Sequence, residues 1–326
     1  MDAKRVVVAD VSNPESAKRW NEDLAGLPID LVLIDDPEEE SLRAAVHGAH
    51  ILITRRRAIN DVVLDAAGSN LKMLLKLGRW TFGIDTNACS QRGIRIETVP
   101  QLSCISVAEH AMTLLLMCAR TMLPSHLGVV SGAYRDLGLT PAVTAERSFA
   151  FKWLPVKPFE LFEKTLGIIG FGEIGMELAI RARGFGMNVI YNKRTRLEQD
   201  AEALFGVSYR SLDDLLAESD FISLHSPHTP ETDRLLGRRQ FEMMKSTAFV
   251  INTARGGEID ESAMVDALQH GEIAGAGLDV FVQEPLPYDH PLTRMDNVVL
   301  CPHIGGGSGT GRADQRERVR DLITHV

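Results

Sequence analysis

Cysteine is scarce in this chain and follows no metal-binding or redox pattern. Four cysteines occur among 326 residues without a CxxC pair, at Cys89, Cys104, Cys118 and Cys301. Structural zinc sites and thioredoxin-type redox sites need such closely spaced pairs. We therefore expect neither a metal site nor a redox pair, and we interpret the four residues as buried or unreactive thiols.

The chain also lacks a surplus of positive charge and a long apolar run. Lysine and arginine number 35 against 44 acidic residues, a formal net charge of −9, whereas binding to nucleic acid requires clustered positive charge. No apolar run approaches the ~20 residues that span a bilayer. The start, MDAKRVVVAD, lacks the apolar region and cleavage site of a secretory signal. We expect no nucleic acid partner, no membrane partner and a cytoplasmic location.

Short apolar runs alternate regularly with longer amphipathic stretches. A length of 326 residues, 44% of them apolar, is enough for two domains. The alternation predicts parallel strands connected by helices, an α/β fold. Four strands are expected at 6–9, 29–34, 51–54 and 71–77, and six more at 166–170, 188–191, 221–225, 248–252, 274–280 and 298–302. The second set is enough for a complete doubly wound domain.

A strongly apolar stretch, SVAEHAMTLLLMCARTM at 106–122, separates the two sets of strands. It is apolar on most sides, so we expect a largely buried helix that opens the second domain. Residues 125–163 then mix Gly, Pro, Thr and aromatic residues without helical or strand periodicity, and a plain loop of this length is unusual in a compact domain. We interpret this segment as an arm that lies against a second subunit.

A glycine motif follows the first strand of the second set. The residues Gly170-Phe171-Gly172-Glu173-Ile174-Gly175 stand between an expected strand and a helical pattern. The first glycine permits a tight turn, the second lets backbone approach a pyrophosphate, and the third lets helix and strand pack closely. The phosphates would lie at the helix N-terminus. We predict a dinucleotide site here, with contacts from Gly170, Gly172, Glu173, Ile174 and Gly175.

The end of the next strand indicates which dinucleotide is preferred. An NAD site places Asp or Glu there to bind the ribose hydroxyls, but this chain reads Asn192-Lys193-Arg194-Thr195. Two cations and a hydroxyl suit the additional 2′-phosphate of NADP(H). We predict a preference for NADP(H), with NAD(H) also accepted. The alternative is that Lys193 and Arg194 form a solvated strand end.

Three further motifs follow in order: NTARGGEIDE (252–261), GLDVFVQEP (277–285) and CPHIGG (301–306). With SVAEH and the glycine motif, the chain resembles the D-isomer-specific 2-hydroxyacid dehydrogenase family over nearly its whole length. The resemblance implies two doubly wound parallel-sheet domains of the α/β class. A Rossmann dinucleotide-binding domain at 104–303 would be inserted into a flavodoxin-like substrate domain at 1–103 and 304–326. It also implies a homodimer, built on the helix and arm at about 106–163.

By the same resemblance, Arg255, Glu284 and His303 occupy the catalytic positions. Reduction of a 2-keto acid to a D-2-hydroxy acid needs a proton donor that works near neutral pH, and histidine meets this need. A carboxylate on the other ring nitrogen would orient the ring and favour its protonated form, the role expected for Glu284. The planar fork of Arg255 can bind the substrate carboxylate and polarise the carbonyl. Taken alone, each of the three residues could instead be structural.

Further cofactor contacts carry over by motif to Ser226, Pro227, Thr232, Ala254, Asp279 and Gly305. The contact of Asp279 is the most specific of these predictions, because a carboxylate after an apolar strand can accept a hydrogen bond from the nicotinamide amide. The alternative for the polar members of this group is capping of a turn or a strand end.

The expected substrate loop departs from the family pattern. The family usually has small residues in a sequence like GAGxDNID, whereas this chain has Gly78-Arg79-Trp80 at the start of that loop. Arg55, Arg56 and Arg57 follow the strand at 51–54, at the edge where open α/β sheets bind ligands. We expect Gly78, Arg79, Trp80, Arg55 and Arg255 to bind substrate. The arginines of the first domain either meet a second anionic group on the substrate or form a solvated rim.

The expected substrates are glyoxylate or hydroxypyruvate, or an acid with a second anionic group. Formate dehydrogenases of similar architecture have a glutamine where Glu284 stands, which argues against that activity. Phosphite-oxidising relatives have a lysine at the position of Arg79, so a phosphite-type dehydrogenase stays an alternative. The dinucleotide-sensing corepressors also resemble this family and keep similar residues, so a binding protein of that kind is the other alternative.

Overall fold

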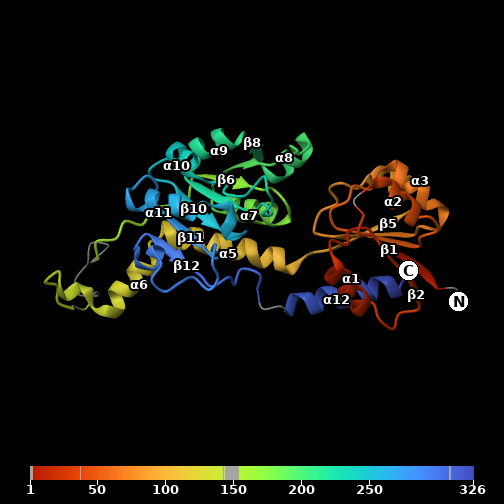
Figure 1. Cartoon of the computed structure of the whole chain (residues 1–326), viewed down its shortest axis with the longest axis horizontal. Helices are drawn as coiled ribbons and strands as arrows, with labels where there is room; N and C mark the ends of the chain where they lie inside the picture. Colours follow the sequence, from red (N-terminus) through yellow and green to blue (C-terminus); the bar gives the residue numbers. More distant parts are fainter. Residues whose placement is uncertain (1–2, 37, 142, 144–153, 308–309) are drawn as a thin grey trace. The chain divides into compact units, whose positions relative to one another are not determined.

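The chain folds as two compact units, and both of its ends belong to the same unit. Unit 1 comprises Met1–Ser103 and Ser308–Val326, and unit 2 comprises Cys104–Gly307. The computed structural model describes residues 3–36, 38–141, 143, 154–307 and 310–326, and Figure 1 shows the chain coloured along its sequence. The substrate and dinucleotide roles expected for the two parts of the chain stay predictions.

Unit 1 contains a parallel sheet with the strand order β2-β1-β3-β4-β5. Its strands are β1 (Lys4–Val8), β2 (Ile29–Leu33), β3 (Ile51–Thr54), β4 (Met73–Leu77) and β5 (Arg95–Val99). This is the flavodoxin-like order of a doubly wound sheet. The sequence analysis misses β5, RIETV, because in this edge strand only Val99 is buried.

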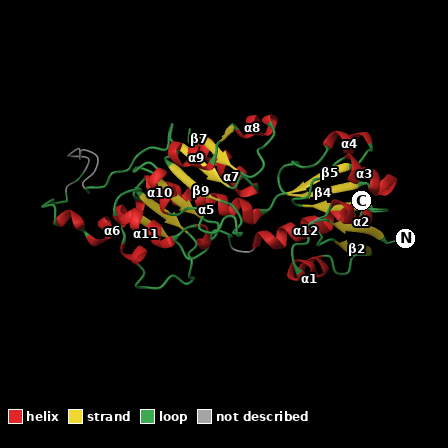
Figure 2. Ribbon diagram, turned by 45° about the horizontal axis from the view of Figure 1, so that its top comes forward, coloured by secondary structure: helices red, strands yellow, loops and turns green. Residues whose placement is uncertain are grey.

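Alternate residues of these strands bury opposite faces of the sheet. Val7 and Leu52 belong to the apolar cluster with α2, α3 and α4, whereas Val6 and Ile51 pack with α1 and α12. Figure 2 shows helices on both faces of this sheet. The elements are α1 (Pro14–Asp23), α2 (Glu39–Ala45), α3 (Asp61–Ala67), η1 (Gly68–Asn70), α4 (Thr86–Gln91) and α12 (Thr310–Thr324).

Unit 2 contains a parallel sheet with the order β12-β11-β10-β9-β6-β7-β8. Its strands are β6 (Thr165–Ile169), β7 (Asn188–Asn192), β8 (Val207–Tyr209), β9 (Phe221–Leu224), β10 (Phe249–Asn252), β11 (Gly275–Leu278) and β12 (Val298–Leu300). This is the doubly wound Rossmann order with an additional strand. The short edge strand β8 is the one that the sequence analysis misses. The fold class predicted from the sequence, two doubly wound parallel sheets, is confirmed.

Helices cover the sheet of unit 2 on both sides. Leu215, Phe241 and Met264, from α9, α10 and α11, share an apolar cluster with Ile222 and Val250 of the sheet. The elements of this unit are α5 (Leu102–Ala119), α6 (Met122–Ser131), η2 (Ala133–Arg135), α7 (Glu173–Gly184), α8 (Gln199–Phe205), α9 (Leu212–Glu218), α10 (Arg238–Met243), η3 (Gly256–Glu258), α11 (Glu261–Gln269) and η4 (Pro291–Arg294). The close packing of β11 on α5 requires a small residue at Gly277, where a Cβ would lie 3.0 Å from Cβ of Leu114.

The apolar helix expected at 106–122 is α5, which begins and ends slightly earlier in the chain. Of its 18 residues, 44% are buried. By length and mean hydropathy, 1.6, it is the one helix among the described residues that could cross a membrane. Core helices of globular proteins pass the same test, so this property alone is weak evidence of a membrane span.

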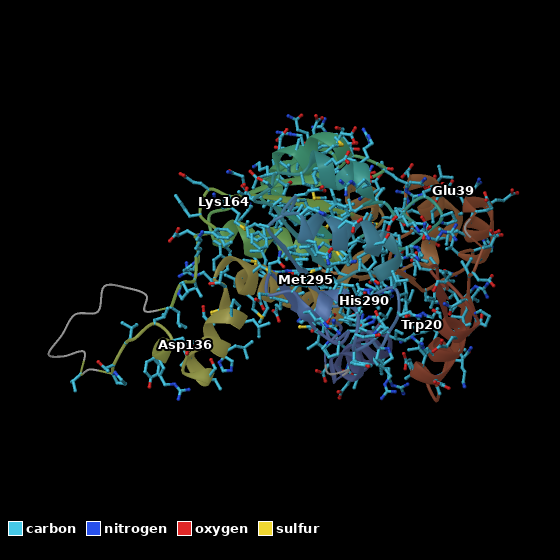
Figure 3. All side chains as sticks on the ribbon, turned by 60° about the vertical axis from the view of Figure 1, so that its left-hand side comes forward. Trp20, Glu39, Asp136, Lys164, His290 and Met295 are labelled. Atoms are coloured by element: carbon cyan, nitrogen blue, oxygen red, sulfur yellow. The ribbon has the colours of Figure 1, made fainter. Side chains whose placement is uncertain are left out.

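The segment α6–η2 lies apart from the sheet of unit 2 in all three views, and Figure 3 labels Asp136 at its end. No residue of α6 is buried, and Leu127, Val129 and Val130 are 55%, 53% and 71% exposed. Residues 142 and 144–153 of the expected arm lie outside the described residues. The contact of this arm with a second subunit stays a prediction.

Candidate active site

His303 and Glu284, which come from separate motifs, are hydrogen-bonded to each other. His303 follows β12 and Glu284 follows β11, and these strands are neighbours in the sheet. The Nδ1 atom of His303 lies 2.6 Å from Oε2 of Glu284. The imidazole is 47% exposed, so the ring can reach a ligand through Nε2 while Glu284 holds the opposite nitrogen.

Both oxygens of the Glu284 carboxylate have partners. Oε1 accepts a hydrogen bond from the backbone N–H of Phe281 at 3.1 Å, and Oε2 faces His303. Burial acts to raise the pKa of Glu284, but the two hydrogen bonds and the positive charges of His303 and Arg255 together lower the pKa below its usual value. Glu284 is therefore ionised at neutral pH. An ionised carboxylate only accepts hydrogen bonds, so the contact requires a proton on Nδ1 of His303.

Arg255 is presented by the loop that follows β10. The buried side chain of Asn252 holds this loop, since its Nδ2 donates to the carbonyl of Arg255 and its Oδ1 accepts from the N–H of Ala254, both at 2.9 Å. At Gly256 a Cβ would lie 2.0 Å from the backbone carbonyl carbon of Phe281. Only glycine allows this approach, and it brings the Arg255 loop against the loop that carries Glu284.

A pocket of about 700 Å³ in unit 2 is lined by Arg255, Glu284 and His303 together. The structure thus brings the three predicted catalytic residues to one concave surface. The pocket is also lined by residues that the sequence analysis does not assign to a site, namely His228, Asp233 and Arg234 after β9 and Asp260, Glu261 and Ser262 at the start of α11. Their place beside Arg255 depends on strand pairing, which leaves no local pattern in the sequence.

The predicted glycine turn lies between β6 and α7. Gly170 has a φ of 86°, and a Cβ there would lie 2.4 Å from the backbone nitrogen of Ser226. At Gly175 a Cβ would lie 2.9 Å from the carbonyl oxygen of Gly170, so this glycine lets the helix pack on the turn. At Gly172, by contrast, no atom of the described residues lies within 4 Å of the Cβ position. This space beside the N-terminus of a 12-residue helix fits the pyrophosphate of a dinucleotide.

A buried network organises the loop that follows β7. Tyr191 donates to Oε1 of Glu202 at 2.8 Å and accepts from the N–H of Leu197 at 2.9 Å. Arg196 donates to both oxygens of Glu202 at 2.8 Å. The carboxylate in this network is therefore neutralised by Arg196 and is not free for a ribose.

The predicted 2′-phosphate residues lie on the same loop. Asn192 donates to the carbonyl of Arg210 at 2.8 Å, which holds the end of β7. Burial lowers the pKa of Lys193. Within the described part of the chain, Lys193 and Arg194 have no ion-pair partner, and Arg194 and Thr195 are exposed. The loop therefore offers positive charge, and the buried carboxylate beside it, Glu202, is already paired with Arg196.

Comparison with known proteins identifies the family. A family model described as "D-isomer specific 2-hydroxyacid dehydrogenase, NAD binding domain" matches residues 113–305. The glyoxylate reductase of Pyrococcus furiosus is 41% identical over 241 residues, which are 74% of this chain and 68% of that protein. The chain belongs to the D-isomer specific 2-hydroxyacid dehydrogenase family.

Further relatives agree with this assignment. The glyoxylate/hydroxypyruvate reductase B of Yersinia pestis is 40% identical over 271 residues, 83% of this chain and 78% of that protein. A solved structure of the NADPH-dependent glyoxylate/hydroxypyruvate reductase of Sinorhizobium meliloti, in complex with NADP and malonate, has a TM-score of 0.57 and 26% identity over 98% of this chain and 92% of that chain. This D-2-hydroxyacid dehydrogenase is an oxidoreductase that uses a nicotinamide dinucleotide and acts on small 2-keto and 2-hydroxy acids.

In this dehydrogenase, two of the residues expected to touch the cofactor are engaged within the protein. The hydroxyl of Ser226 donates to Oε1 of Glu258. The hydroxyl of Thr232 donates to the carbonyl of Pro227 at 2.7 Å and accepts from the N–H of Thr229 at 2.8 Å. These contacts shape the turn after β9. Cofactor contacts of Ser226, Pro227, Thr232 and Ala254 stay predictions.

Asp279 anchors the loop that carries His303. Its carboxylate oxygens accept from the N–H groups of Ile304 at 2.9 Å and Gly305 at 2.8 Å, and Nε2 of His110 lies 3.2 Å from it. His110, Asp279 and Cys301 place potential metal-ligand atoms within 4.8 Å of one another. Both oxygens of Asp279 already have partners, and we assign no metal to this group.

Glu258 is a residue of this neighbourhood that the sequence analysis misses. Its side chain is fully buried, and burial raises its pKa. Hydrogen bonds from the hydroxyl of Ser226 and from the backbone N–H of Arg255 lower the pKa, but by less than burial raises it. Its Oε2 has no hydrogen-bond partner among the described residues. No local pattern in NTARGGEIDE marks Glu258 as buried, because its surroundings depend on the pairing of this segment with the loop after β9.

The three consecutive arginines of unit 1 do not have equivalent roles. Their backbone N–H groups all donate to the carboxylate of Asp10, at 2.5, 3.0 and 3.0 Å for Arg55, Arg56 and Arg57. The guanidinium of Arg57 also donates to two backbone carbonyls at 2.6 and 2.5 Å, so this side chain has a structural role. The side chains of Arg55 and Arg56 are exposed.

The predicted substrate loop begins directly after β4. Gly78 has a φ of 153°, and the guanidinium carbon of Arg79 lies 5.6 Å from the ring centroid of Trp80. This stacking presents a cation on an aromatic surface. Binding of substrate by Gly78, Arg79, Trp80 and Arg55 stays a prediction.

The burial of His225, directly after β9, predicts that stability depends on pH. Burial lowers its pKa from 6.5 to about 3. In acid the unfolded chain therefore takes up a proton that the folded chain does not bind, and the free energy of unfolding falls as the pH decreases from 6.5 to about 3, by up to about 1.4 kcal/mol per pH unit. We expect the melting temperature of His225→Asn to depend less on pH in this range. The exposed His47→Asn is the control, and an unchanged pH dependence in His225→Asn would contradict the prediction.

Proposed function

We propose that this dehydrogenase reduces glyoxylate, hydroxypyruvate or a related 2-keto acid to the D-2-hydroxy acid with NADPH. The observation that carries the proposal is the single pocket lined by Arg255, Glu284 and His303, in which Glu284 holds the ring of His303 at 2.6 Å. The names of the relatives from Pyrococcus furiosus and Yersinia pestis support this substrate class.

The three side chains have distinct roles in this proposal. Bound nicotinamide would supply the hydride for the carbonyl carbon of the substrate. His303 gives the proton on Nε2 to the carbonyl oxygen, while Glu284 holds Nδ1 and stabilises the positive ring. Arg255 binds the substrate carboxylate through two parallel N–H donors and so orients the carbonyl. The same groups act in the opposite sense when a hydroxy acid is oxidised.

The glycine turn is the proposed place of the dinucleotide. Gly170, Gly172 and Gly175 with the first residues of α7, Glu173 and Ile174, would hold the pyrophosphate. Asp279 already binds the backbone of Ile304 and Gly305, so a nicotinamide amide would share an acceptor that also positions the His303 loop. The exposed Thr195 and the cations Lys193 and Arg194 would bind the 2′-phosphate.

The catalytic roles predict a sharp loss of turnover. We expect His303→Ala and Arg255→Ala to lower kcat/KM for 2-keto acids by about a hundredfold or more, because proton transfer and carboxylate binding are removed. NADPH affinity, measured by fluorescence titration, should change little. The exposed His270→Ala is the matched control. Full activity in either catalytic variant would refute the role of that residue.

The cofactor preference predicts a charge-specific effect. We expect the unmodified enzyme to have a higher kcat/KM with NADPH than with NADH. Lys193→Ala/Arg194→Ala should lower kcat/KM for NADPH by about tenfold or more, because charge-assisted bonds to the 2′-phosphate are lost, and leave NADH turnover nearly unchanged. The exposed Arg43→Ala is the control. Parity of the two cofactors in the unmodified enzyme would contradict the preference.

The homodimer proposed for this family member rests on α6. Its exposed Leu127, Val129 and Val130 form an apolar surface that a second subunit would cover. We expect the unmodified protein to run as a dimer in light scattering, and Leu127→Asp/Val130→Asp to run as a monomer because two charges would be buried in the interface. Val62→Asp, at a site 47% exposed on α3, is the control. A monomeric unmodified protein would overturn the proposal.

A further inference from the structure

The pocket that holds Arg255 contains a second guanidinium. Arg234 lies in the loop after β9 and lines the same pocket as Arg255, Glu284 and His303. Its backbone N–H donates to the carbonyl of Gly257 at 2.8 Å, two residues beyond Arg255. Two residues of chain span at most roughly 7 Å, so two long arginine side chains start close enough to reach one small ligand.

The local pairing of two loops sets this position. Leu236 forms an isolated parallel bridge with Ile259, and its N–H donates to the carbonyl of Glu258 at 3.1 Å. The segment that carries Arg234 therefore runs beside the segment that carries Arg255. Arg234 has a φ of 48°, a left-handed conformation that residues with a Cβ rarely adopt. Among the described residues four non-glycine residues have positive φ, and two of them, Arg234 and His303, line this pocket.

Four carboxylates also line the pocket, and all four are engaged. Asp233 lies 2.8 Å from Nε2 of His228, and Glu284 is paired with His303. Asp260 caps α11 by accepting from the N–H of Ala263 at 3.2 Å and from a serine hydroxyl at 2.7 Å. Glu261 lies 3.2 Å from Nε2 of His290 and accepts from the N–H of Val282 at 3.3 Å.

The two arginines of the pocket form no ion pair among the described residues, although Nη1 of Arg255 donates to the carbonyl of Ala254 at 2.5 Å. In the described parts of the chain neither Arg234 nor Arg255 has a carboxylate within ion-pair distance, and Arg234 is exposed. Hydrogen bonds from Ser262 and Ala263 lower the pKa of Asp260, and the charge of Arg234 adds to this effect without forming a pair. The pocket therefore presents two guanidinium forks, each able to take a carboxylate.

We propose that Arg234 binds a second anionic group, most simply a second carboxylate, of a 2-keto acid whose first carboxylate is bound by Arg255. This specificity role rests on the proposed function, because it assumes that Arg255 orients the keto acid. It places the determinant for dicarboxylic substrates in unit 2, on the loop after β9. The acidic neighbour of Arg234, Asp233, has its Oδ1 atom 2.8 Å from Nε2 of His228 and forms no ion pair with the Arg234 guanidinium among the described residues.

The test compares keto acids with and without the second charge. The probes are oxaloacetate, 2-ketoglutarate and phosphonopyruvate against glyoxylate, pyruvate and 2-ketobutyrate, so that carboxylate and phosphonate are distinguished. Arg234→Gly removes the guanidinium and suits the positive φ, so we expect an equal or higher melting temperature. Arg239→Ala is the control, since this exposed arginine pairs with Asp213 at 2.6 Å and does not line the pocket.

We expect Arg234→Gly to lower kcat/KM for the dianionic keto acids by about tenfold or more, mostly through KM, and to leave the monoanionic acids within about twofold. An equal fall for both groups, or no fall for the dianionic acids, would overturn the inference and leave the proposed function standing. If the unmodified enzyme reduced none of these acids, the proposed function would fail. In that case, calorimetry would compare the affinities of the unmodified enzyme and of Arg234→Gly for 2-ketoglutarate and for pyruvate. If Arg234→Gly kept the affinity for both acids, the inference would be refuted.

Discussion

The close approach of the loop after β10 to the loop after β11 is the constraint on which this active site depends. A Cβ at Gly256 would lie 2.0 Å from the carbonyl carbon of Phe281, so any side chain there would push the two loops apart. Such a shift would separate Arg255 from Glu284 and leave the His303 pair without its cationic neighbour. Because backbone atoms make the contact, the backbone sets how closely the loops that carry Arg255 and Glu284 approach each other.

Parallel strand packing explains why residues far apart in sequence meet. In a parallel sheet all carboxyl ends lie at one edge, and a doubly wound sheet leaves a crevice there at the switch of strand order. In unit 2 that switch lies between β6 and β9. The residues with predicted functions lie within three residues of the ends of the strands: Gly170 after β6, Ser226 after β9, Arg255 after β10, Asp279 after β11 and His303 after β12.

Much of this arrangement could be predicted from sequence, because central parallel strands are buried on both faces and form continuous apolar runs. The edge strands β5 and β8 could not be predicted from the sequence, since β5 exposes Arg95 and β8 is only three residues long. The glycine turn was predictable because its motif is local in sequence: Gly170 and Gly175 meet steric needs of the turn, and Gly172 leaves space beside the helix N-terminus. Arg234 and Glu258 were not, because their role comes from the pairing of two loops that are distant in sequence. The sequence left open whether the arginines at 55–57 bind an anion or form a solvated rim, and it did not indicate that the guanidinium of Arg57 binds backbone carbonyls.

The features that oppose stability gather around the same pocket. Arg234 and His303 have left-handed backbones, and the buried Glu258, next to the pocket residue Gly257 in sequence, keeps one oxygen without a hydrogen bond in the described structure. Strained residues of this kind persist only where the surrounding structure holds them firmly in place. Here β9 and β10, which precede the loops of Arg234 and Glu258, are buried at every residue except Phe249. A rigid sheet that tolerates local strain at its edge can hold polar groups in fixed positions before substrate arrives. In the proposed reaction, charges held in this way need not reorganise during proton transfer, which is the condition under which preorganised dipoles lower a reaction barrier.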